Sequence, residues 1–331
     1  MDLSVYPRVR LAHLPTPLER MPRLSEAMGG PKVFVKRDDA TGLSLGGNKT
    51  RKLEYSLGHA LSEGADTIVT AGGLQSNHAR QTAGACAKLG LDCELILTRN
   101  VPDTELGYDT TGNIQLDRIL GAQVHLHPGN ADRTALMADA AARLTSAGKR
   151  PYVIPLGASD AVGSLGYVNA ALELVAQANS MELRLDYLVL ANSSGGTFAG
   201  LAAGFAAIGY PVKLIGVDVD GQVNALHETV RPLAAKILAG FGLESRANAV
   251  ATELLCGHAG PGYGCPTDDM REAVTLAAGY EGLILDPVYS GKAMAGLLGL
   301  IRAGRFSKDE TVVFLHSGGA PALFAYGSVF Q

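Results

Sequence analysis

The sequence predicts an α/β protein of two domains, each an open, mostly parallel twisted sheet flanked by helices. Two patterns indicate this class. Short apolar runs alternate with segments of helical periodicity, and glycine directly follows two of those segments, as expected where a helix ends. Strands that are apolar throughout belong to parallel sheets covered on both faces, so helices should flank each sheet. A length of 331 residues also exceeds what one small core needs.

Seven strands and two helices can be placed along the chain. The strands are expected at Thr67–Ala71, Cys93–Leu97, Val124–Leu126, Tyr152–Ile154, Tyr187–Ala191, Leu214–Val217 and Val312–Leu315. The helices are expected at His78–Leu89, ending before Gly90, and at Asn113–Leu120, ending before Gly121. Four of the strands lie between residues 67 and 154. They predict a small domain of residues 53–157, inserted into a larger domain made of residues 1–52 and 158–331.

Composition limits the classes of function. The chain is 47% hydrophobic and 18% charged, with a net charge of −4 and a pI near 6.1, so neither nucleic acid nor an anionic membrane is expected as a partner. The four cysteines form no CxxC pair and no zinc spacing, and Cys86 and Cys93 fit a buried helix and strand. No apolar run approaches the ~20 residues that span a bilayer, and Met1–Val5 lack the layout of a signal peptide. A soluble protein in a reduced, cytoplasmic setting is expected.

Lys49, in the run GGNKTRK at residues 46–52, is the most informative residue. Such a lysine can capture a carbonyl cofactor as a Schiff base if neighbouring positive charge, here from Arg51 and Lys52, lowers its pKa. The alternatives are an exposed lysine in a basic turn and a phosphate-binding P-loop. The P-loop is excluded because Asn48 stands where that motif needs glycine, and charged residues rather than an apolar strand lie upstream.

A glycine-rich segment after an expected strand offers donors for a phosphate. Residues 193–197 (SSGGT) open a helix rich in Ala, Gly and Leu. Successive glycines expose amide hydrogens, and the helix dipole adds positive potential, so a phosphate dianion would bind here. Helix entry alone would also explain the glycines. The candidate phosphate ligands are Ser194, Gly195, Gly196 and Thr197.

A second polar segment, QSNH at residues 75–78, lies between an expected strand and a helix. Asn77 is a candidate for a hydrogen bond to a cofactor ring oxygen, and Ser76 for contact with a substrate carboxylate or a proton. His78 is a further candidate on the substrate side. Helix capping explains Ser76 and Asn77 equally well. Both polar segments end strands, so in an open α/β fold they should face one crevice. With Lys49 they indicate pyridoxal phosphate (PLP) chemistry.

Two tyrosines and one serine lie in unusual surroundings. Tyr263, in GPGYG, belongs to a segment too rich in glycine for a helix or strand, so a mobile loop is expected. Tyr289, in DPVYSGK, directly precedes an expected helix. Both phenols are candidates to orient the substrate or to move protons, and the alternative is two tyrosines packed at turns. Ser317, in HSGG after the last expected strand, also points towards the crevice unless it only caps a helix.

These motifs resemble a known family over nearly the whole chain. The order and spacing of GGNKTRKLE, QSNHARQTA, SSGGTFAGL, GPGYG, DPVYSGKAMAGL and HSGGAPALF are similar to the PLP-dependent D-cysteine desulfhydrase and 1-aminocyclopropane-1-carboxylate (ACC) deaminase group, which has the tryptophan-synthase β-subunit fold. The resemblance implies that Lys49 carries PLP in a cleft between the two domains. It also implies a homodimer acting on a small amino acid.

Within that group, two positions distinguish the activities. The resemblance implies that ACC deaminases have glutamate after the tyrosine of DPVY and leucine in HxGG, whereas this chain has Ser290 and Ser317. A serine hydroxyl can hydrogen-bond the pyridine nitrogen but supplies no formal charge, so the ring is a weaker electron sink, suited to β-elimination. D-cysteine is therefore the expected substrate, giving pyruvate, sulfide and ammonia. L-cysteate sulfo-lyases share DPVYS, so release of sulfite from L-cysteate stays open.

Two readings from other classes are weaker. A non-catalytic small-molecule binding protein with the same fold would not need lysine at position 49. A nicotinamide-dependent dehydrogenase would need G-x-G-x-x-G after an early strand and an acidic residue ~20 positions later, and this chain lacks that pattern.

Overall fold

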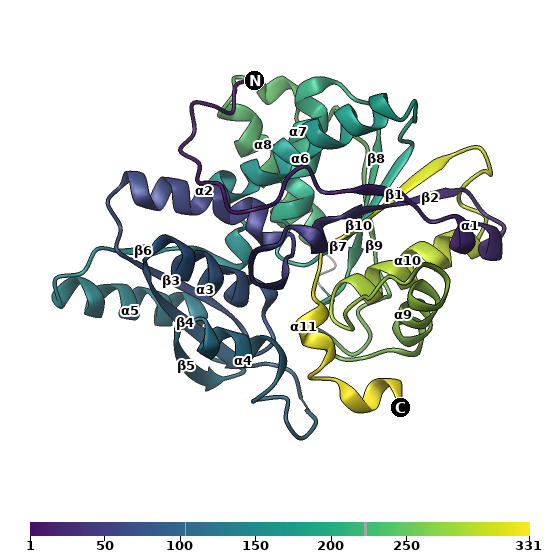
Figure 1. Cartoon of the computed structure of the whole chain (residues 1–331). Coiled ribbons are helices and arrows are strands. Elements are labelled where there is room, and N and C mark those ends of the chain that lie inside the picture. The colour runs from purple at the N-terminus through teal and green to yellow at the C-terminus, as the bar shows by residue number, and fades with distance from the viewer. Residues whose placement is uncertain (103, 222–223) are drawn as a thin grey trace.

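Two separate β-sheets organise the computed structural model, which describes residues 1–102, 104–221 and 224–331 (Figure 1). The strands are β1 Leu18–Arg20, β2 Lys32–Arg37, β3 Thr67–Gly73, β4 Asp92–Arg99, β5 Gln123–Pro128, β6 Pro151–Val153, β7 Tyr187–Asn192, β8 Lys213–Asp218, β9 Thr252–Leu255 and β10 Thr311–His316. The helices are α1 Pro22–Met28, α2 Lys49–Ser62, α3 Asn77–Leu89, α4 Gly112–Ile119, α5 Arg133–Ser146, α6 Ala161–Ser180, α7 Gly196–Ile208, α8 Arg231–Ala239, α9 Asp268–Glu281, α10 Ser290–Arg302 and α11 Ala320–Leu323.

Both sheets are mostly parallel, as predicted. The larger has the order β1-β2-β10-β7-β8-β9, in which only the β1–β2 pair is antiparallel, and the smaller has the order β5-β4-β3-β6. The seven expected strands are confirmed to within a few residues as β3 to β8 and β10. The helices expected before Gly90 and Gly121 are α3 and α4, and both glycines have the left-handed backbone (φ 70° and 80°) that ends a helix.

Three strands of the larger sheet were not predicted from the sequence. They are β1, β2 and β9. β1 has three residues, two of them exposed, and β9 is an edge strand with every residue partly exposed. β2 is a central strand, but lysine stands at both ends of its apolar core and disguises the pattern. Short and edge strands carry little apolar signal, which accounts for the omission of β1 and β9.

The larger sheet has a hydrophobic core on each face. Along β10, Val313 and Leu315 pack into the core formed with α6 and α7, whereas Val312 and Phe314 pack into the opposite core with α9 and α10. This alternation follows from the two-residue period of a strand. Figure 1 shows α6, α7 and α8 on one side of the sheet and α9 and α10 on the other.

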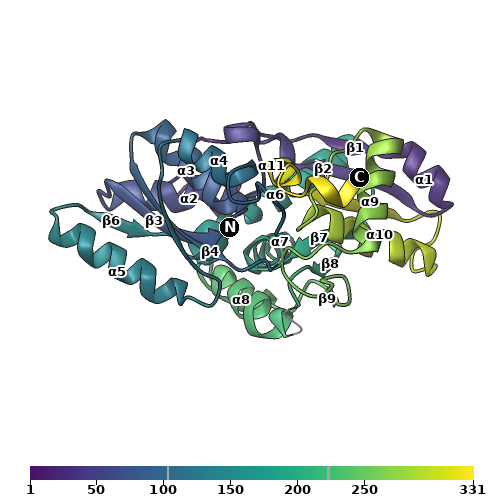
Figure 2. The ribbon, with the colours of Figure 1, turned by 90° about the horizontal axis from the view of Figure 1, so that it is seen from below.

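The smaller sheet is also covered on both faces, by helices of different origin. Ile68 and Leu95 pack with α2, α3 and α4, and Val69 and Ile96 pack with α5. Seen from below in Figure 2, α5 lies across one face of this sheet and the other three helices lie across the opposite face. Cys86 and Cys93 are buried in the first of these cores, as expected.

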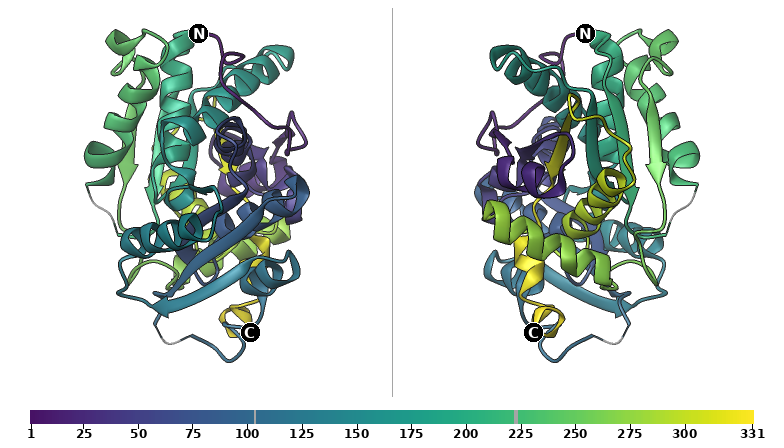
Figure 3. Two further views of the ribbon diagram at one scale, coloured as in Figure 1. Left: turned by 90° about the vertical axis from the view of Figure 1, so that its left-hand side faces the viewer. Right: turned by 90° about the vertical axis from the view of Figure 1, so that its right-hand side faces the viewer.

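Helix α2 joins the two halves of the molecule. It packs against α6 beside the larger sheet and against α3 beside the smaller one. The boundary predicted between residues 52 and 53 falls inside this helix, so the division into two domains stays a prediction. Figure 3 shows the two ends of the chain at opposite ends of the molecule. Among the described residues, no helix combines the length and the hydropathy that crossing a membrane requires.

Candidate active site

One cavity of about 630 Å³ is lined by residues from both sheets. It lies where β3, β4, β7 and β10 end, which is the usual place for a ligand in open α/β sheets, and its volume suits a small molecule. The predicted site residues that line it are Lys49, Ser76, Asn77, His78, Ser194, Gly195, Thr197, Tyr263, Tyr289 and Ser317. Gly196 lies behind this wall, against Lys52 and Ser159. The structure thus brings the motifs together, and their chemical roles stay predictions.

Lys49 is the first residue of α2 and not part of a turn. Its Nζ lies 3.5 Å from the carbonyl oxygen of Gly157, and burial lowers the pKa of the amine to about 8 because the charged form loses hydration. On that value roughly a tenth of the amine is uncharged at pH 7. The uncharged amine is the form that attacks a carbonyl carbon, so this lysine is prepared for covalent attachment.

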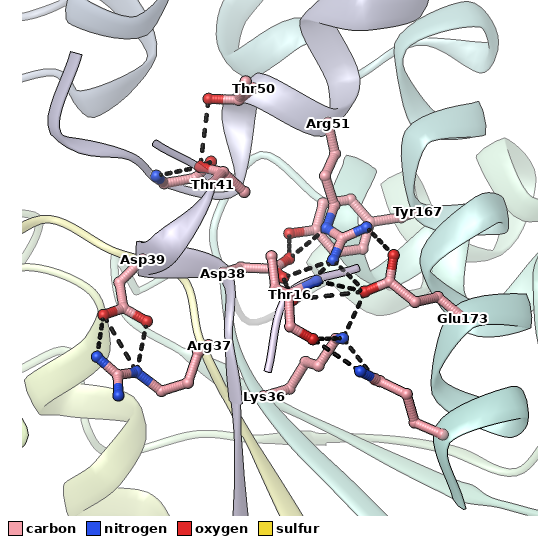
Figure 4. Close-up of polar contacts among 12 residues, drawn as sticks. Thr16, Lys36, Arg37, Asp38, Asp39, Thr41, Thr50, Arg51, Tyr167 and Glu173 are labelled. Atoms are coloured by element: carbon pink, nitrogen blue, oxygen red, sulfur yellow. Dashed lines mark hydrogen bonds and ion pairs between the residues drawn. The ribbon is translucent and has the colours of Figure 1, made fainter. Parts of the chain in front are cut away.

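The expectation that charge from Arg51 and Lys52 lowers the pKa of Lys49 is wrong, because burial alone lowers it. Arg51 is buried in a cluster of polar and charged side chains, drawn in Figure 4, and does not line the cavity. Its guanidinium donates to Asp38 through Nε and Nη2, both at 2.9 Å, and to Glu173 through Nη1 at 3.0 Å and Nη2 at 2.8 Å. Two carboxylates neutralise its charge. Hereafter the buried charge cluster means Thr16, Lys36, Asp38, Arg51, Tyr167 and Glu173.

Lys52 also belongs to the site, although the sequence indicated it only as a source of positive charge near Lys49. Its Nζ donates to the carbonyl oxygen of Gly157 at 2.6 Å and to Oγ of Ser159 at 2.8 Å. Burial and the neighbouring charge of Lys49 hold the pKa of Lys52 well below its ordinary value. Residues three apart share a face of a helix, so the pairing of Lys49 with Lys52 was visible in the sequence.

The first turn of α7 forms a second group of donors. Gly195 precedes the helix with φ 81°, a left-handed conformation that favours glycine, and leaves the amide hydrogens of the turn without intrahelical partners. Oγ of Ser194 lies 2.7 Å from Oγ of Ser159, and Oγ1 of Thr197 accepts from Nδ2 of Asn48 at 3.1 Å. These hydroxyl, amide and backbone groups surround the end of the cavity next to Lys52. An anion with several oxygens suits that set of donors.

The QSNH segment both caps a helix and lines the cavity. Oγ of Ser76 accepts from the backbone nitrogen of Ala79 at 3.1 Å, so the capping explanation is confirmed for Ser76, whereas Asn77 is the first residue of α3. Nε2 of His78 lies 2.8 Å from Oγ1 of Thr70. Burial and the charges of the nearby lysines hold the pKa of His78 well below its ordinary value, so the ring is neutral.

The orientation of Asn77 is set by residues that the sequence did not single out. Oδ1 of Asn77 accepts from Nδ2 of Asn113 at 2.9 Å, and Oδ1 of Asn113 accepts from Nε of Arg80 at 2.7 Å. Gln75 adds two bonds to Asn113, through its own side chain and its carbonyl oxygen. With its oxygen occupied in this way, the side chain of Asn77 presents its amino group to the cavity. Asn113 belongs to the first turn of α4, and no motif in the sequence marks it as a site residue.

Tyr263 and Tyr289 meet in the cavity. Their hydroxyl oxygens are 2.6 Å apart, and burial raises the pKa of both phenols above the ordinary value, so both are protonated at neutral pH. The segment around Tyr263 is irregular, as predicted. Lys292 donates to the carbonyl oxygens of Ala259 at 2.6 Å and Gly262 at 2.9 Å, and Tyr326 donates to Gly264 at 2.9 Å. These three hydrogen bonds anchor the loop, and the mobility expected from its glycines stays a prediction.

With this geometry established, similarity to known proteins decides the family. Residues 9–318 match the family model described as "Pyridoxal-phosphate dependent enzyme". The chain belongs to this family. It is 45% identical over 324 residues to the D-cysteine desulfhydrases of Salmonella typhi and Salmonella newport, and the alignment covers 98% of this chain and 97% of each relative. The resemblance inferred from the motifs is confirmed.

Solved structures agree with that assignment. An ACC deaminase homologue has a TM-score of 0.89 at 37% identity, with 99% of this chain and 96% of that chain covered. A hydrogen sulfide-producing enzyme from Fusobacterium nucleatum has a TM-score of 0.68 at 17% identity, with 95% and 97% covered, and shares the fold. The predicted fold class is confirmed.

The residues of the cavity fit the cofactor of this PLP-dependent enzyme. A Cβ added to Gly157 would lie 2.5 Å from Oγ of Ser194 and 3.2 Å from Nζ of Lys49, so glycine leaves the space between the amine and the anion donors open. The lowered pKa of Lys49 suits attachment to an aldehyde, and the first turn of α7 suits a phosphate. Amine and phosphate donors therefore lie beside each other, as the aldehyde and the phosphate arm on adjacent ring carbons of PLP require.

The two serines expected to face the pyridine ring differ in position. Ser317 lines the cavity, but Ser290 is fully buried at the start of α10 and does not line it. Oγ of Ser290 donates to Oδ1 of Asp286 at 2.6 Å and accepts from the backbone nitrogen of Asp286 at 2.8 Å. Its hydroxyl is committed to this turn, which also holds the backbone of Tyr289. Of the two, only Ser317 is a candidate partner for the ring.

Proposed function

We propose that this chain catalyses β-elimination from a small β-substituted amino acid, converting D-cysteine to pyruvate, sulfide and ammonia. The similarity to D-cysteine desulfhydrases over nearly the full length supports this substrate. The observation that carries the proposal is the Lys49 amine, with its pKa lowered to about 8, in one cavity with the α7 turn and the paired tyrosines.

The cofactor side of the proposal assigns each group by its chemistry. Lys49 would hold the aldehyde of PLP. The turn Ser194, Gly195, Gly196 and Thr197 holds the phosphate, with Lys52 behind it as a second buried amine. The amino group of Asn77 would donate to the ring oxygen, and the hydroxyl of Ser317 would be the partner of the ring nitrogen. When bound, PLP supplies an electron sink for the pair released when the α-proton leaves.

On the substrate side, Ser76, Asn77 and His78 form the donor wall for the amino-acid carboxylate at the start of α3. The uncharged amine of Lys49 takes the α-proton, since its pKa lies far nearer neutrality than that of either phenol. Tyr263 and Tyr289 are protonated and share one hydrogen bond, so either can donate a proton to the departing sulfur while the other stabilises the resulting oxygen.

The assembly and setting of the enzyme are also proposals. We infer a homodimer and a cytoplasmic location from the family, and the division into residues 1–52 with 158–331 and residues 53–157 from the two sheets. Four free cysteines, two of them buried, are consistent with a reduced environment.

A substrate panel tests the proposed function. The PLP-loaded protein is incubated with D-cysteine, L-cysteine, L-cysteate and ACC, and sulfide, sulfite, pyruvate and 2-oxobutyrate are measured. D-cysteine should give equal amounts of sulfide and pyruvate. Lys49→Ala should lose that activity by several orders of magnitude and lose cofactor trapping by borohydride, whereas Lys308→Ala, at an exposed lysine, should keep both. Dominant 2-oxobutyrate from ACC, or no product from any compound, would overturn the proposal.

A further inference from the structure

Arg80, on α3, is a buried cation to which the proposed chemistry gives no role. It is 0% exposed, and no ion pair in the described part of the chain includes it. Burial lowers the pKa of its guanidinium to about 10, so the group is still charged at neutral pH. Asp117, on α4, is the carboxyl group whose charge acts on it. Burial raises the pKa of Asp117 to about 8, so near neutrality this carboxyl group is mostly protonated and does not cancel the charge of Arg80.

Neutral oxygen atoms hold the charge of Arg80 in place of a counter-ion. Its Nη1 donates to the carbonyl oxygens of Ser44 and Gly46, the latter at 3.0 Å. Its Nε donates to Oδ1 of Asn113 at 2.7 Å. Ser44 and Gly46 belong to the loop that leads into α2, of which Lys49 is the first residue. One guanidinium therefore links the backbone before the cavity amine to Asn113.

The hydrogen bonds that lead from Arg80 to the cavity all point in one direction. A guanidinium has donors and no acceptor, so Asn113 turns its oxygen towards Arg80 and its amino group away from it. That amino group donates to Oδ1 of Asn77 and to the carbonyl oxygen of Gln75, both at 2.9 Å. Asn77, whose oxygen is thus occupied, presents its own amino group to the cavity. In this amide chain, Arg80 to Asn113 to Asn77, each hydrogen bond polarises the next, and the first donor is a cation.

Helix geometry places the members of the amide chain opposite each other. Asn77 and Arg80 are three residues apart in α3, and Asn113 and Asp117 are four apart in α4, so each pair lies on one side of its helix. α3 and α4 pack against each other and cover the same face of the smaller sheet, as Figure 2 shows. The amide chain is therefore part of the packing between two helices.

We propose that Arg80 is a positioning residue for the cofactor, which stabilises the ionised form of the ring oxygen through Asn113 and Asn77. This inference rests on the proposed function, because it takes PLP as the ligand and Asn77 as the donor to its ring oxygen. A polarised N–H binds an anionic oxygen more strongly than a neutral hydroxyl, so the amide chain favours loss of the proton from that hydroxyl. A negative charge then lies at the cavity end of a chain that begins at a buried cation.

A titration of the ring hydroxyl tests this inference without any catalytic step. Pyridoxine 5'-phosphate has an alcohol where PLP has the aldehyde, so it does not attach to Lys49. It is bound to the full-length protein, and its ultraviolet absorption at a series of pH values gives the ionisation constant of the ring hydroxyl. Arg80→Gln should lower this constant by about three- to tenfold, as expected when a charge-assisted hydrogen bond is replaced by a neutral one. Arg80→Lys, which keeps the charge with fewer donors, should fall between.

A double-mutant cycle determines whether the effect passes through Asn113. If it does, Arg80→Gln should change the ionisation constant in the wild-type protein and hardly at all in the Asn113→Ala background. Urea unfolding checks that each variant is folded, and Arg80→Lys takes the place of Arg80→Gln in the cycle if the latter does not fold. Equal effects in both backgrounds would show that Arg80 acts through the loop before Lys49 or through the fold, and would overturn the inference.

Arg118→Gln is the matched control, because it removes an exposed cation from the same helix as Asn113. It should leave the ionisation constant of the ring hydroxyl unchanged. An ionisation constant in Arg80→Gln equal to that of the wild type would contradict the proposed role, and so would a wild-type protein that does not bind pyridoxine 5'-phosphate. Sulfide release from D-cysteine reports on the proposed function separately, since the titration involves no substrate.

Discussion

Replacing Glu173 by Gln should unbalance the buried charge cluster beneath α2. Glu173 accepts two hydrogen bonds from Arg51, one from the backbone nitrogen of Thr16 at 3.0 Å and one from Nζ of Lys36. Lys36 and Arg51 are both fully buried, with 0% and 1% of their surface exposed. In Glu173→Gln, Asp38 alone would face two buried cations.

The expected loss of stability follows from the buried positive charge that Glu173→Gln leaves without a carboxylate partner. Removing one partner of a buried ion pair typically costs about 3–5 kcal/mol, because the remaining charge loses both hydration and its counter-ion. The side chain of Glu173 is 10% exposed, so some water reaches it, and we expect the lower end, about 3 kcal/mol. That is a large fraction of the ~5–15 kcal/mol by which folded proteins are stable.

Urea unfolding followed by circular dichroism measures this cost. The control is Glu272→Gln, which breaks an ion pair with Arg302 whose side chains are 47% and 49% exposed and should cost less than about 1 kcal/mol. Adding Lys36→Met to Glu173→Gln removes the surplus cation and should restore part of the stability. Equal losses in Glu173→Gln and Glu272→Gln, or no recovery in the double variant, would refute this account of the cluster.

The buried charge cluster also predicts how the difference in unfolding free energy between wild type and Glu173→Gln depends on pH. Burial alone raises the pKa of Glu173, but hydrogen bonds and charge from Arg51 and Lys36 outweigh it and hold the pKa below its ordinary value. The unfolded chain then binds more protons as pH falls, so the stability from Glu173 is present above the unfolded pKa of about 4.3 and is lost through the lower, folded value. The gap between wild type and Glu173→Gln should be constant near neutrality and close in acid.

Three further predictions concern the cavity. Covalent attachment of PLP to Lys49, trapped with borohydride, should speed up with rising pH and reach half its maximum near the pKa of about 8, since only the uncharged amine attacks; a midpoint at the ordinary lysine value would contradict the effect of burial. Asn113→Ala should weaken PLP binding by about tenfold in a fluorescence titration, because Asn77 would be free to turn its amide, and unchanged affinity would exclude that orienting role. Lys292→Met should lower kcat for elimination more than cofactor affinity, because the loop carrying Tyr263 loses two anchors, and an unchanged kcat would show that the loop holds without them.

The parts of the fold that could be predicted are those whose signal is local. Apolar runs such as Tyr187–Ala191 are visible because both faces of the strand are buried, and glycines such as Gly90 mark helix ends because only they take the left-handed backbone without cost. β2 was not predicted because a lysine at position 36 is typical of an exposed position. Lys36 is buried because α6, more than a hundred residues later, supplies the oxygen atoms of Glu173 and Gln177. No local pattern contains that information.

The same distinction separates the predicted from the missed site residues. Ser76, Ser194 and Ser317 follow strands, and the carboxyl ends of parallel strands meet at one edge, so their place around the cavity follows from topology. Asn113 and Arg133 reach the site from the starts of α4 and α5, whose placement depends on packing across the smaller sheet. Residues at the start of a helix that does not follow a polar strand-end motif carry no local signal of a site, so they could not be predicted from the sequence.

The geometry of the first turn of α2 explains why Lys49 and Arg51 lie in different surroundings. Successive residues of an α-helix are turned by about 100°, so Lys49 faces the cavity while Arg51, about 200° further round the helix, faces nearly the opposite way, into the buried charge cluster. Lys52 lies behind the cavity wall, where it donates to Gly157 and Ser159. Thr50, between these faces, donates through its backbone nitrogen and its hydroxyl to Gln81, which also donates to the carbonyl oxygen of Asn77. One turn thus fixes the amine to the core of the larger sheet and to the donor wall of the smaller one. The ion pairs of Arg51 anchor the helix turn that carries Lys49, and burial alone lowers the pKa of the Lys49 amine.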